Sequence, residues 1–260
     1  MQDLRVTLIQ PDMKWQNPAE NRAMYAQLMD QNAGNTDLVL LPEMFSTGFT
    51  MDSRTAAEPM GGESCLWLQE QAKQRGVAIS GSLAITEGGR YFNRMVFTYP
   101  DGSQVCYDKR HLFRMAGEHE RYQPGDKRVV VEYRGWKILL QVCYDLRFPV
   151  FSRNSNDYDL ALYVANWPAP RRQPWRKLLQ ARAIENLCYV AGVNRVGTDA
   201  NGHKYSGDSM LVDFKGDLLI DHNPDIPFCD TATLSLVELS QFKESFPAWM
   251  DADDFTIDNS

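Results

Sequence analysis

The sequence predicts an α/β protein in which layers of β-sheet are covered by helices. Short runs of β-branched and aliphatic residues alternate with segments of helical period along most of the 260 residues. Turn signals such as Tyr99–Ser103 and Arg134–Gly135 separate several of these runs and indicate hairpins. No segment repeats with a period of roughly 20–50 residues, and no linker rich in Pro, Gly or Ser divides the chain. We therefore expect a single domain over residues 1–260.

The expected elements of the first half follow from apolar periodicity and from residues that begin or end helices. Asn17 and Pro18 favour a helix start, and Gly76 favours a helix end. The expected helices are Pro18–Gln31 and Ser64–Arg75. Strands are expected at Arg5–Gln10, Asp37–Leu41, Val77–Leu83, Arg94–Tyr99 and Gln104–Asp108.

The second half continues the alternation and adds a hairpin whose turn signal is Lys215-Gly216. The acidic stretch Ser245–Ser260 has no clear period, and it is either a disordered tail or an arm docked on a partner subunit. Helices are expected at Phe148–Asn156 and Pro174–Asn186. Strands are expected at Val129–Tyr133, Trp136–Cys143, Leu160–Ala165, Tyr189–Arg195, Ser209–Phe214 and Asp217–Asp221.

Charge and cysteine content exclude several classes of protein. With 27 Lys and Arg against 34 Asp and Glu, the formal net charge is −7, and no basic block suggests binding to nucleic acid or to an anionic membrane. The longest apolar runs are too short to span a bilayer, and the N-terminus lacks the pattern of a signal peptide. Five cysteines without a C-x-x-C pair exclude a complete disulfide framework and a zinc ribbon. These features favour a protein of the reducing cytoplasm.

Polar groups with catalytic potential follow several of the expected strands. Glu43 comes just after one apolar run, Cys143 ends a second, and Asn166 follows a third. Lys109 stands at the end of a fourth expected strand. Since buried strands of open α/β sheets present functional groups at their carboxyl ends, we expect the active site at these positions.

Each of these residues has an ordinary structural interpretation when it is taken alone. Cys143 fits a buried inert cysteine, Glu43 a charge at the rim of a sheet, and Lys109 a solvated lysine. Together they form a coherent set for acyl transfer. The carboxylate accepts the thiol proton, the thiolate attacks a carbonyl carbon, and the ammonium stabilises the oxyanion.

The motifs around these residues resemble those of the nitrilase superfamily of carbon–nitrogen hydrolases. Glu43 ends the motif LLPE, Lys109 lies in YDKRHLF, and Cys143 begins CYDLRFP. A second glutamate of the family matches Glu118 in GEHE, and the downstream blocks match NWP (166–168), LLQARAIEN (178–186) and YSGDS (205–209). The matches run in order from about residue 4 to residue 221. The resemblance is closest to the omega-amidase branch, whose members deamidate 2-oxoglutaramate and 2-oxosuccinamate.

The resemblance implies a four-layer α-β-β-α sandwich that forms a homodimer and needs no cofactor. It implies that Cys143 is the nucleophile, Glu43 the general base, and Lys109 the group that stabilises the oxyanion. Glu118 is then a second carboxylate of the pocket, and the N–H of Tyr144 donates to the oxyanion. The implied reaction is hydrolysis of a small linear amide through a thioester. Lys109 is expected to favour the thiolate, and two carboxylates in one pocket are not expected to ionise independently.

An omega-amide substrate of this kind carries a carboxylate at its far end. Because the net charge of −7 repels such an anion, a positive group is expected near the pocket. Arg171 is the first choice for this group, and Arg147 and Arg172 are the other candidates. Arg147 has a competing structural role, in which it pairs with Asp145 or Glu43. Asn166 and Trp167 are also expected in the substrate site, with Trp167 as its roof.

The sequence indicates no other kind of site, and three other functions are alternatives to this hypothesis. The four histidines show no metal-binding spacing, so no metal site is expected, and His111 is expected to hold the loop after Lys109 by a hydrogen bond. No phosphate-binding glycine motif is present. The alternatives are a nitrilase or N-carbamoyl amide hydrolase with the same triad, a transferase that passes the acyl group to an amine, and a binding protein without activity.

Overall fold

Twelve strands assemble into two six-stranded sheets in the computed structural model, which describes residues 2–32 and 35–257. Two further described strands, β10 (Val196–Thr198) and β11 (Lys204–Ser206), pair with each other in a separate sheet. The first sheet has the order β14-β1-β2-β3-β4-β5. Its strands are β14 (Phe228–Leu234), β1 (Leu4–Gln10), β2 (Leu38–Leu40), β3 (Ala78–Glu87), β4 (Arg90–Thr98) and β5 (Gln104–Asp108). The second sheet has the order β13-β12-β9-β8-β7-β6. Its strands are β13 (Leu218–Asp221), β12 (Met210–Val212), β9 (Tyr189–Val193), β8 (Leu160–Val164), β7 (Trp136–Val142) and β6 (Val130–Tyr133).

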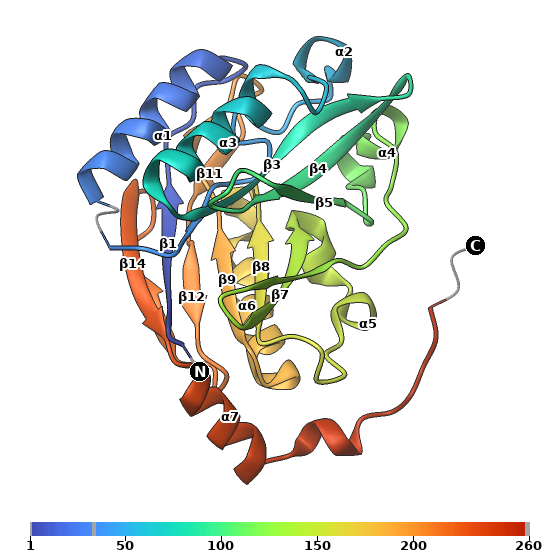
Figure 1. Cartoon of the computed structure of the whole chain (residues 1–260). Coiled ribbons are helices and arrows are strands. Elements are labelled where there is room, and N and C mark those ends of the chain that lie inside the picture. Colours follow the sequence, from blue (N-terminus) through green and yellow to red (C-terminus); the bar gives the residue numbers. More distant parts are fainter. Residues whose placement is uncertain (1, 33–34, 258–260) are drawn as a thin grey trace.

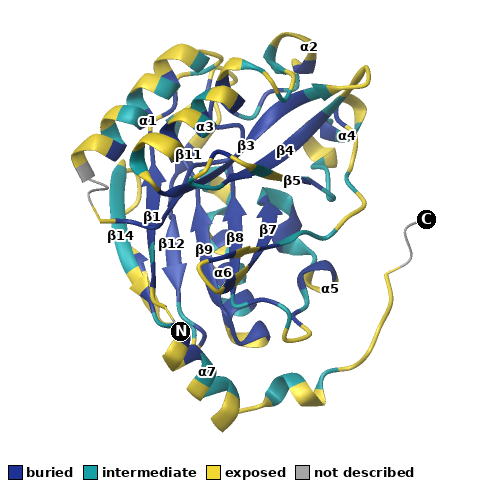
Figure 2. Ribbon diagram, in the orientation of Figure 1, coloured by how far each residue is buried: buried dark blue, intermediate teal, exposed yellow. Residues whose placement is uncertain are grey.

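Helices cover the outer face of each sheet, so the order of layers is α-β-β-α (Figure 1). Helices α1 (Pro18–Asn32) and α3 (Glu63–Arg75) pack on the first sheet, and α6 (Arg172–Asn186) packs on the second. The burial pattern in Figure 2 agrees, because the central strands are buried while the helices expose their outward sides. The four-layer sandwich implied by the family resemblance is therefore confirmed.

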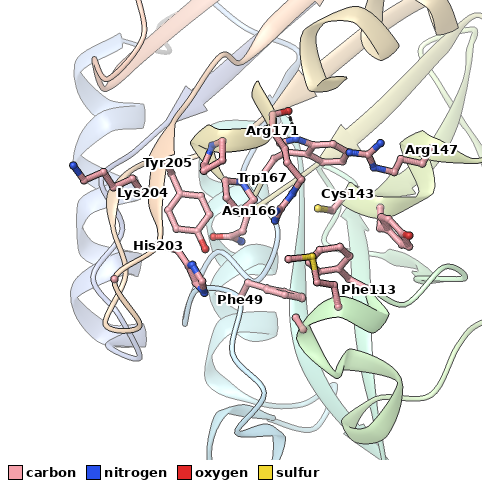
Figure 3. Close-up of a pocket in the computed structure, with 16 residues that line it drawn as sticks. Phe49, Phe113, Cys143, Arg147, Asn166, Trp167, Arg171, His203, Lys204 and Tyr205 are labelled. Carbon is pink, nitrogen blue, oxygen red and sulfur yellow. Dashed lines mark hydrogen bonds between the residues drawn. The ribbon is translucent and has the colours of Figure 1, made fainter. Parts of the chain in front are cut away.

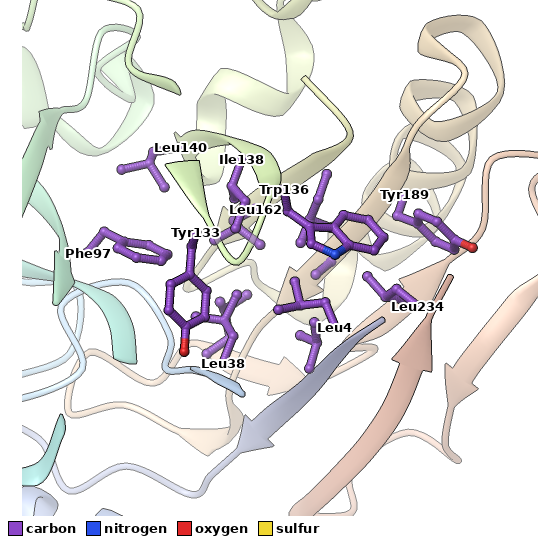
Figure 4. Packing of buried hydrophobic residues seen from close by; sticks show 14 of the residues in the cluster. Leu4, Leu38, Phe97, Tyr133, Trp136, Ile138, Leu140, Leu162, Tyr189 and Leu234 are labelled. Carbon is purple, nitrogen blue, oxygen red and sulfur yellow. The ribbon is translucent and has the colours of Figure 1, made fainter. Parts of the chain in front are cut away.

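The largest core lies between the two sheets. Leu4, Leu38 and Phe97 of the first sheet meet Ile138 and Leu162 of the second, and all five are fully buried (Figure 4). Burial of a large aliphatic or aromatic side chain contributes about 1.5–3 kcal/mol, so this interface is a main source of stability. Helix α7 (Leu236–Ser245) adds Leu236 and Leu239 to the same core.

The central strands of both sheets are parallel, which brings their carboxyl ends to one edge. Strand β2 pairs in parallel with β1 and β3, and β8 pairs in parallel with β7 and β9. Val142 at the end of β7 lies opposite Val164 at the end of β8. The segments that follow β2, β7 and β8 therefore begin close together, as the strand-end argument predicted.

Several predicted elements have different bounds in the structure. Strand β3 continues well beyond Leu83 and forms a hairpin with β4, in which Glu87 pairs with Arg90. Gly88 and Gly89 both adopt positive φ (57° and 74°), the conformation that a two-residue hairpin turn of this kind requires. The sequence prediction was wrong here because it did not use the Gly-Gly signal.

The helix expected at Phe148–Asn156 is reduced to the single turn α5 (Pro149–Ser152). The chain leaves the helix because Asn154 anchors the next loop to the end of α6. Its side chain donates to the carbonyls of Tyr158 and Asn186, and its N–H donates to the Asn186 side chain. A local period could not reveal a contact across 32 residues.

The C-terminal part contains elements that the sequence did not predict. Strand β14 pairs antiparallel with β1 from Leu4↔Leu234 to Gln10↔Phe228, and α7 follows it. The shorter elements α2 (Ser53–Ala56), α4 (Glu118–Arg121), β10 (Val196–Thr198) and β11 (Lys204–Ser206) were not predicted either. Beyond α7 the chain makes the turn η4 (Ala248–Asp251) and then continues as an extended segment (Figure 1). Asp251 of the turn and Phe255 of the segment line a cavity together with Pro149 and Val150 of α5. Residues 258–260 of the predicted tail or arm lie outside the described residues.

Across the described ranges, none of the helices combines the length and the apolar character needed to cross a membrane.

Candidate active site

Cys143 lies where β7 ends and the short helix η2 (Cys143–Arg147) begins. Its φ of +47° is unusual for a residue other than glycine and costs on the order of 1–3 kcal/mol. The Cys143 side chain is partly exposed, and it lines a cavity. A strained strand-to-helix turn that presents a thiol in this way is typical of a nucleophile.

Asp145 holds the turn that contains Cys143. One carboxylate oxygen of Asp145 accepts the Val142 N–H (2.9 Å) and the Tyr107 hydroxyl (2.8 Å). The other accepts the His111 N–H (3.0 Å) and lies 2.7 Å from His111 Nδ1. His111 therefore holds the loop after Lys109, as the sequence predicted, and this loop is joined to the turn of Cys143.

Beneath the cavity lies a cluster of three fully buried charged side chains, Glu43, Lys109 and Glu118. Lys109 Nζ lies 2.9 Å from Glu43 Oε1 and 3.0 and 2.9 Å from the two oxygens of Glu118. Glu43 Oε2 accepts the Asn166 N–H at 2.8 Å, and Glu118 Oε2 accepts the Phe113 N–H at 2.6 Å. The structure thus brings Glu43 and Lys109, two of the strand-end residues predicted from the sequence, together with the second glutamate, Glu118.

Asn93 is a member of this cluster that sequence reasoning missed. It is fully buried on β4, and its side-chain N–H groups donate to Glu43 Oε1 (2.8 Å) and Glu118 Oε1 (3.0 Å). Its backbone carbonyl also accepts the Lys109 N–H. An asparagine inside the apolar strand YFNRMVF is the signal that could have identified it, because buried amides need partners.

Burial and mutual charge set the protonation of the cluster. Burial alone disfavours the Lys109 ammonium, but the Glu118 and Glu43 carboxylates outweigh it and raise the pKa of Lys109 above its usual value. Burial and the charge of Glu43 raise the pKa of Glu118, while Lys109 lowers it. The two carboxylates therefore do not ionise independently, as expected.

Burial and the two carboxylates oppose Lys109 at the Cys143 thiol. Burial and then the Glu43 charge raise the pKa of this thiol well above its usual value, and Lys109 offsets only part of the shift. Lys109 lowers the pKa of this thiol and so favours the thiolate, as the sequence predicted, but burial and the charges of Glu43 and Glu118 outweigh it and favour the neutral thiol.

The cavity above Cys143 has a volume of about 430 Å³. Tyr144, Asn166, Trp167 and Arg171, the four predicted substrate-binding residues, all line it together with Cys143 (Figure 3). Among the residues that follow Glu43, Phe49 lies in the wall of the cavity, whereas Met44 and Phe45 are buried in apolar clusters. Unpredicted lining residues include Phe113, His203, Lys204 and Tyr205. Within the described chain, no Asp or Glu side chain lines the cavity.

The three candidate arginines have distinct surroundings. Arg171 lies 5.3 Å from the centre of the Phe113 ring, and its guanidinium points into the cavity on the side of Cys143 (Figure 3). Arg172 is held by two hydrogen bonds to Asp208 (2.6 and 3.0 Å) and is not part of the lining. Arg147 lies 5.0 Å from the Trp167 ring. The proposed pairing of Arg147 with Asp145 or Glu43 is absent from the described contacts, since other donors occupy both carboxylates.

Within residues 2–32 and 35–257, no group of three or more His, Cys, Asp or Glu side chains is arranged to hold a metal ion.

Comparisons with known proteins agree with this geometry. The family described as carbon-nitrogen hydrolase matches residues 5–243. The chain is 46% identical over 258 residues to the omega-amidase YafV of Escherichia coli (strain K12), which covers 99% of this chain and 100% of that protein. It is 30% identical over 251 residues to a 2-oxoglutaramate amidase of Bacillus subtilis (strain 168), with 95% and 96% of the two chains covered.

A solved structure is also similar over its whole length. It is a CN-hydrolase superfamily protein of Xanthomonas campestris with an arsenic adduct in the active site, and it is 45% identical to this chain. The superposition has a TM-score of 0.96 and covers 99% of this chain and 100% of the other. The protein therefore belongs to the carbon–nitrogen hydrolase family, within the nitrilase superfamily, and is a hydrolase that acts on amides.

Proposed function

We propose that this protein hydrolyses the omega-amide of small dicarboxylate mono-amides, such as 2-oxoglutaramate and 2-oxosuccinamate, through a thioester on Cys143. The observation that carries the proposal is a thiol at a cavity that also holds Arg171 and has no acidic lining in the described chain. The names of the similar proteins, omega-amidase and 2-oxoglutaramate amidase, support the same substrate class.

The hydrogen bonds of Glu43 indicate which oxygen accepts the thiol proton. Oε1 already accepts hydrogens from Lys109 and Asn93. Among the described residues, Oε2 accepts only the Asn166 N–H, so it has a lone pair left for the thiol. We therefore assign Oε2 of Glu43 as the general base. Because the thiol is neutral in the resting site, its proton moves to Oε2 as the sulfur attacks.

The first half of the reaction forms the thioester and releases ammonia. The bond from Cys143 Sγ to the amide carbon forms while the carbonyl electrons move onto oxygen. The Lys109 ammonium and the Tyr144 N–H are assigned to stabilise this oxyanion, a contribution of about 10²–10³ in rate for one such donor. When the oxyanion collapses, the C–N bond breaks and the amide nitrogen takes the proton from Glu43 to leave as ammonia.

The second half uses water. Glu43 removes a proton from a water molecule, the oxygen attacks the thioester carbon, and the C–S bond breaks. The sulfur takes the proton back from Glu43, so the thiol and the carboxylate are restored and the carboxylic acid leaves. Glu118 remains hydrogen-bonded to Lys109 throughout, and its role is to keep that ammonium charged and in place.

Arg171 is assigned to the far carboxylate of the substrate. It makes no ion pair with an acidic side chain of the described chain, and the Phe113 ring lies beneath its guanidinium. A guanidinium with free N–H groups binds a carboxylate through two parallel hydrogen bonds. Arg172 is unsuited because Asp208 already occupies it.

The test is ammonia release from a panel of small amides, nitriles and N-carbamoyl amino acids. We expect a higher kcat/KM for 2-oxoglutaramate than for an uncharged amide of equal length. A preference for nitriles or carbamoyl compounds would replace the omega-amide assignment while leaving the triad in use. Equal rates with anionic and uncharged amides would refute the proposed substrate class.

A further inference from the structure

We propose that Asn93 is a positioning residue that keeps the Glu43–Glu118 pair ionised and leaves Oε2 of Glu43 as the proton acceptor for Cys143. The inference rests on the proposed function, since it concerns the proton that the reaction moves. It assigns a role to a residue that does not line the cavity and lies among the carboxylates below it.

The donor chemistry of the cluster excludes a proton from two carboxylate oxygens. Oε1 of Glu43 and Oε1 of Glu118 each contact Lys109 Nζ and Asn93 Nδ2, at 2.8–3.0 Å. Ammonium and amide nitrogens only donate hydrogens, so a carboxyl O–H at either position would have no acceptor. Asn93 therefore favours the charged form of both carboxylates, and its hydrogen bond lowers the pKa of Glu118 against the effect of burial.

Ser82 fixes the orientation of the Asn93 amide. The Ser82 hydroxyl donates to Asn93 Oδ1 at 2.8 Å and accepts the Met44 N–H at 2.9 Å. A flipped amide would point its oxygen at two carboxylates and its N–H groups at a hydroxyl. Met44 has a φ of +43° and follows Glu43 directly, so the same pair of residues also holds the backbone that carries the base.

The other titratable groups around the carboxylates do not replace Asn93. Lys109 approaches from the end of β5 and Cys143 from the end of β7. The hydroxyl of Tyr122, which follows α4, donates to the Thr50 carbonyl, and the Tyr205 hydroxyl of β11 donates to Asp199. Within the described residues, Asn93 is thus the neutral side chain whose hydrogens reach both carboxylates.

The experiment compares Asn93→Ala, Asn93→Asp and Ser82→Ala with the control Ser80→Ala. Ser80 is also a fully buried serine of β3, but its hydroxyl donates to the Val96 carbonyl and not to Asn93. The measurement is the pH dependence of kcat/KM for 2-oxoglutaramate. Loss of two N–H donors should move the acid limb up by about one pH unit or more in Asn93→Ala.

The three test variants should form an ordered series. Asn93→Asp, which keeps the side-chain shape and adds a third carboxyl group, should move the acid limb at least as far as Asn93→Ala. Ser82→Ala, which retains the amide but frees its orientation, should move the limb less and in the same direction. Ser80→Ala should leave the limb in place. A fall in kcat at every pH with an unmoved acid limb in the Asn93 and Ser82 variants would assign a merely structural role and overturn the inference.

A second measurement needs no substrate. The rate of Cys143 alkylation by iodoacetamide is followed against pH, and a Cys143→Ser protein is subtracted for the remaining cysteines. If the wild type hydrolyses no amide, but the acid limb of the profile of alkylation rate against pH moves to higher pH in the Asn93 variants, the proposed function fails and this inference stands. If wild type hydrolyses the amide and neither limb moves in any variant, this inference fails alone.

Discussion

Replacing Lys109 by Met tests the electrostatic balance of the buried cluster most directly. Among the described residues, Lys109 is the cation in hydrogen-bond contact with both Glu43 and Glu118, and all three side chains are fully buried. Removal of the Lys109 ammonium changes the net charge of the ionised cluster from −1 to −2, and the methionine side chain supplies no water to solvate the two carboxylates. Loss of one partner from a buried ion pair costs about 3–5 kcal/mol, so we expect the free energy of unfolding to fall by that amount near pH 8.

The loss of stability should shrink as the pH falls. The Lys109 ammonium lowers the pKa of Glu118, so the variant raises this pKa above the already raised value of the wild type. The folded variant then keeps a proton that the unfolded chain releases above about pH 4.3. Between about pH 4.3 and the raised pKa of Glu118 in the folded variant, the free energy of unfolding therefore falls by about 1.4 kcal/mol for each unit by which the pH rises.

Urea unfolding followed by tryptophan fluorescence, at pH values from about 5 to 8, measures this dependence. The exposed Lys137 of β7 supplies the control Lys137→Met, which should change stability by less than about 0.5 kcal/mol. Combining Lys109→Met with Glu118→Gln returns the cluster charge to −1 and should recover part of the loss. A Lys109→Met protein whose stability parallels that of wild type at every pH would refute the charge assignment.

Three further outcomes are expected from the site. Cys143→Ala and Cys143→Ser should retain the fold and release no ammonia from 2-oxoglutaramate, and wild-type-like turnover in either purified variant would end the covalent mechanism. Arg171→Ala should raise KM for 2-oxoglutaramate by about ten- to a hundredfold without a similar change for an uncharged amide, whereas Arg172→Ala should keep the wild-type ratio. Dialysis against a strong chelator should leave kcat unchanged; a loss that added metal restores would require a metal in the mechanism.

The elements that the sequence predicted correctly are those with strong local patterns. Helices α3 and α6 carry an apolar period, α1 begins at the start signal Asn17-Pro18, and the central strands are uninterrupted apolar runs. Strand β14 has neither signal, because most of Phe228–Leu234 is only partly buried. It becomes a strand by pairing with β1, for example across 224 residues of chain at Thr7 and Thr231, a contact that no local period contains.

The identity and order of the reacting groups were present in the sequence. Glu43, Lys109 and Cys143 end apolar runs, and the order of their motifs carried the family resemblance. Their individual roles were ambiguous from residue type alone, since a buried cysteine or a solvated lysine fits the same letters. The four predicted substrate-binding residues all line the cavity, because their positions next to those strand ends follow from chain connectivity.

Only the tertiary structure decided the protonation and the supporting contacts of the site. Electrostatic energies depend on distance and burial, and these are set by strands from both sheets that meet at one edge. The structure adds the burial and the two carboxylates that oppose the thiolate favoured by Lys109 at Cys143, and it leaves Arg171 facing the cavity while Asp208 occupies Arg172. Asn93 lies among the carboxylates because β4 runs beside β5, which carries Lys109, and this neighbourhood exists only in the folded sheet.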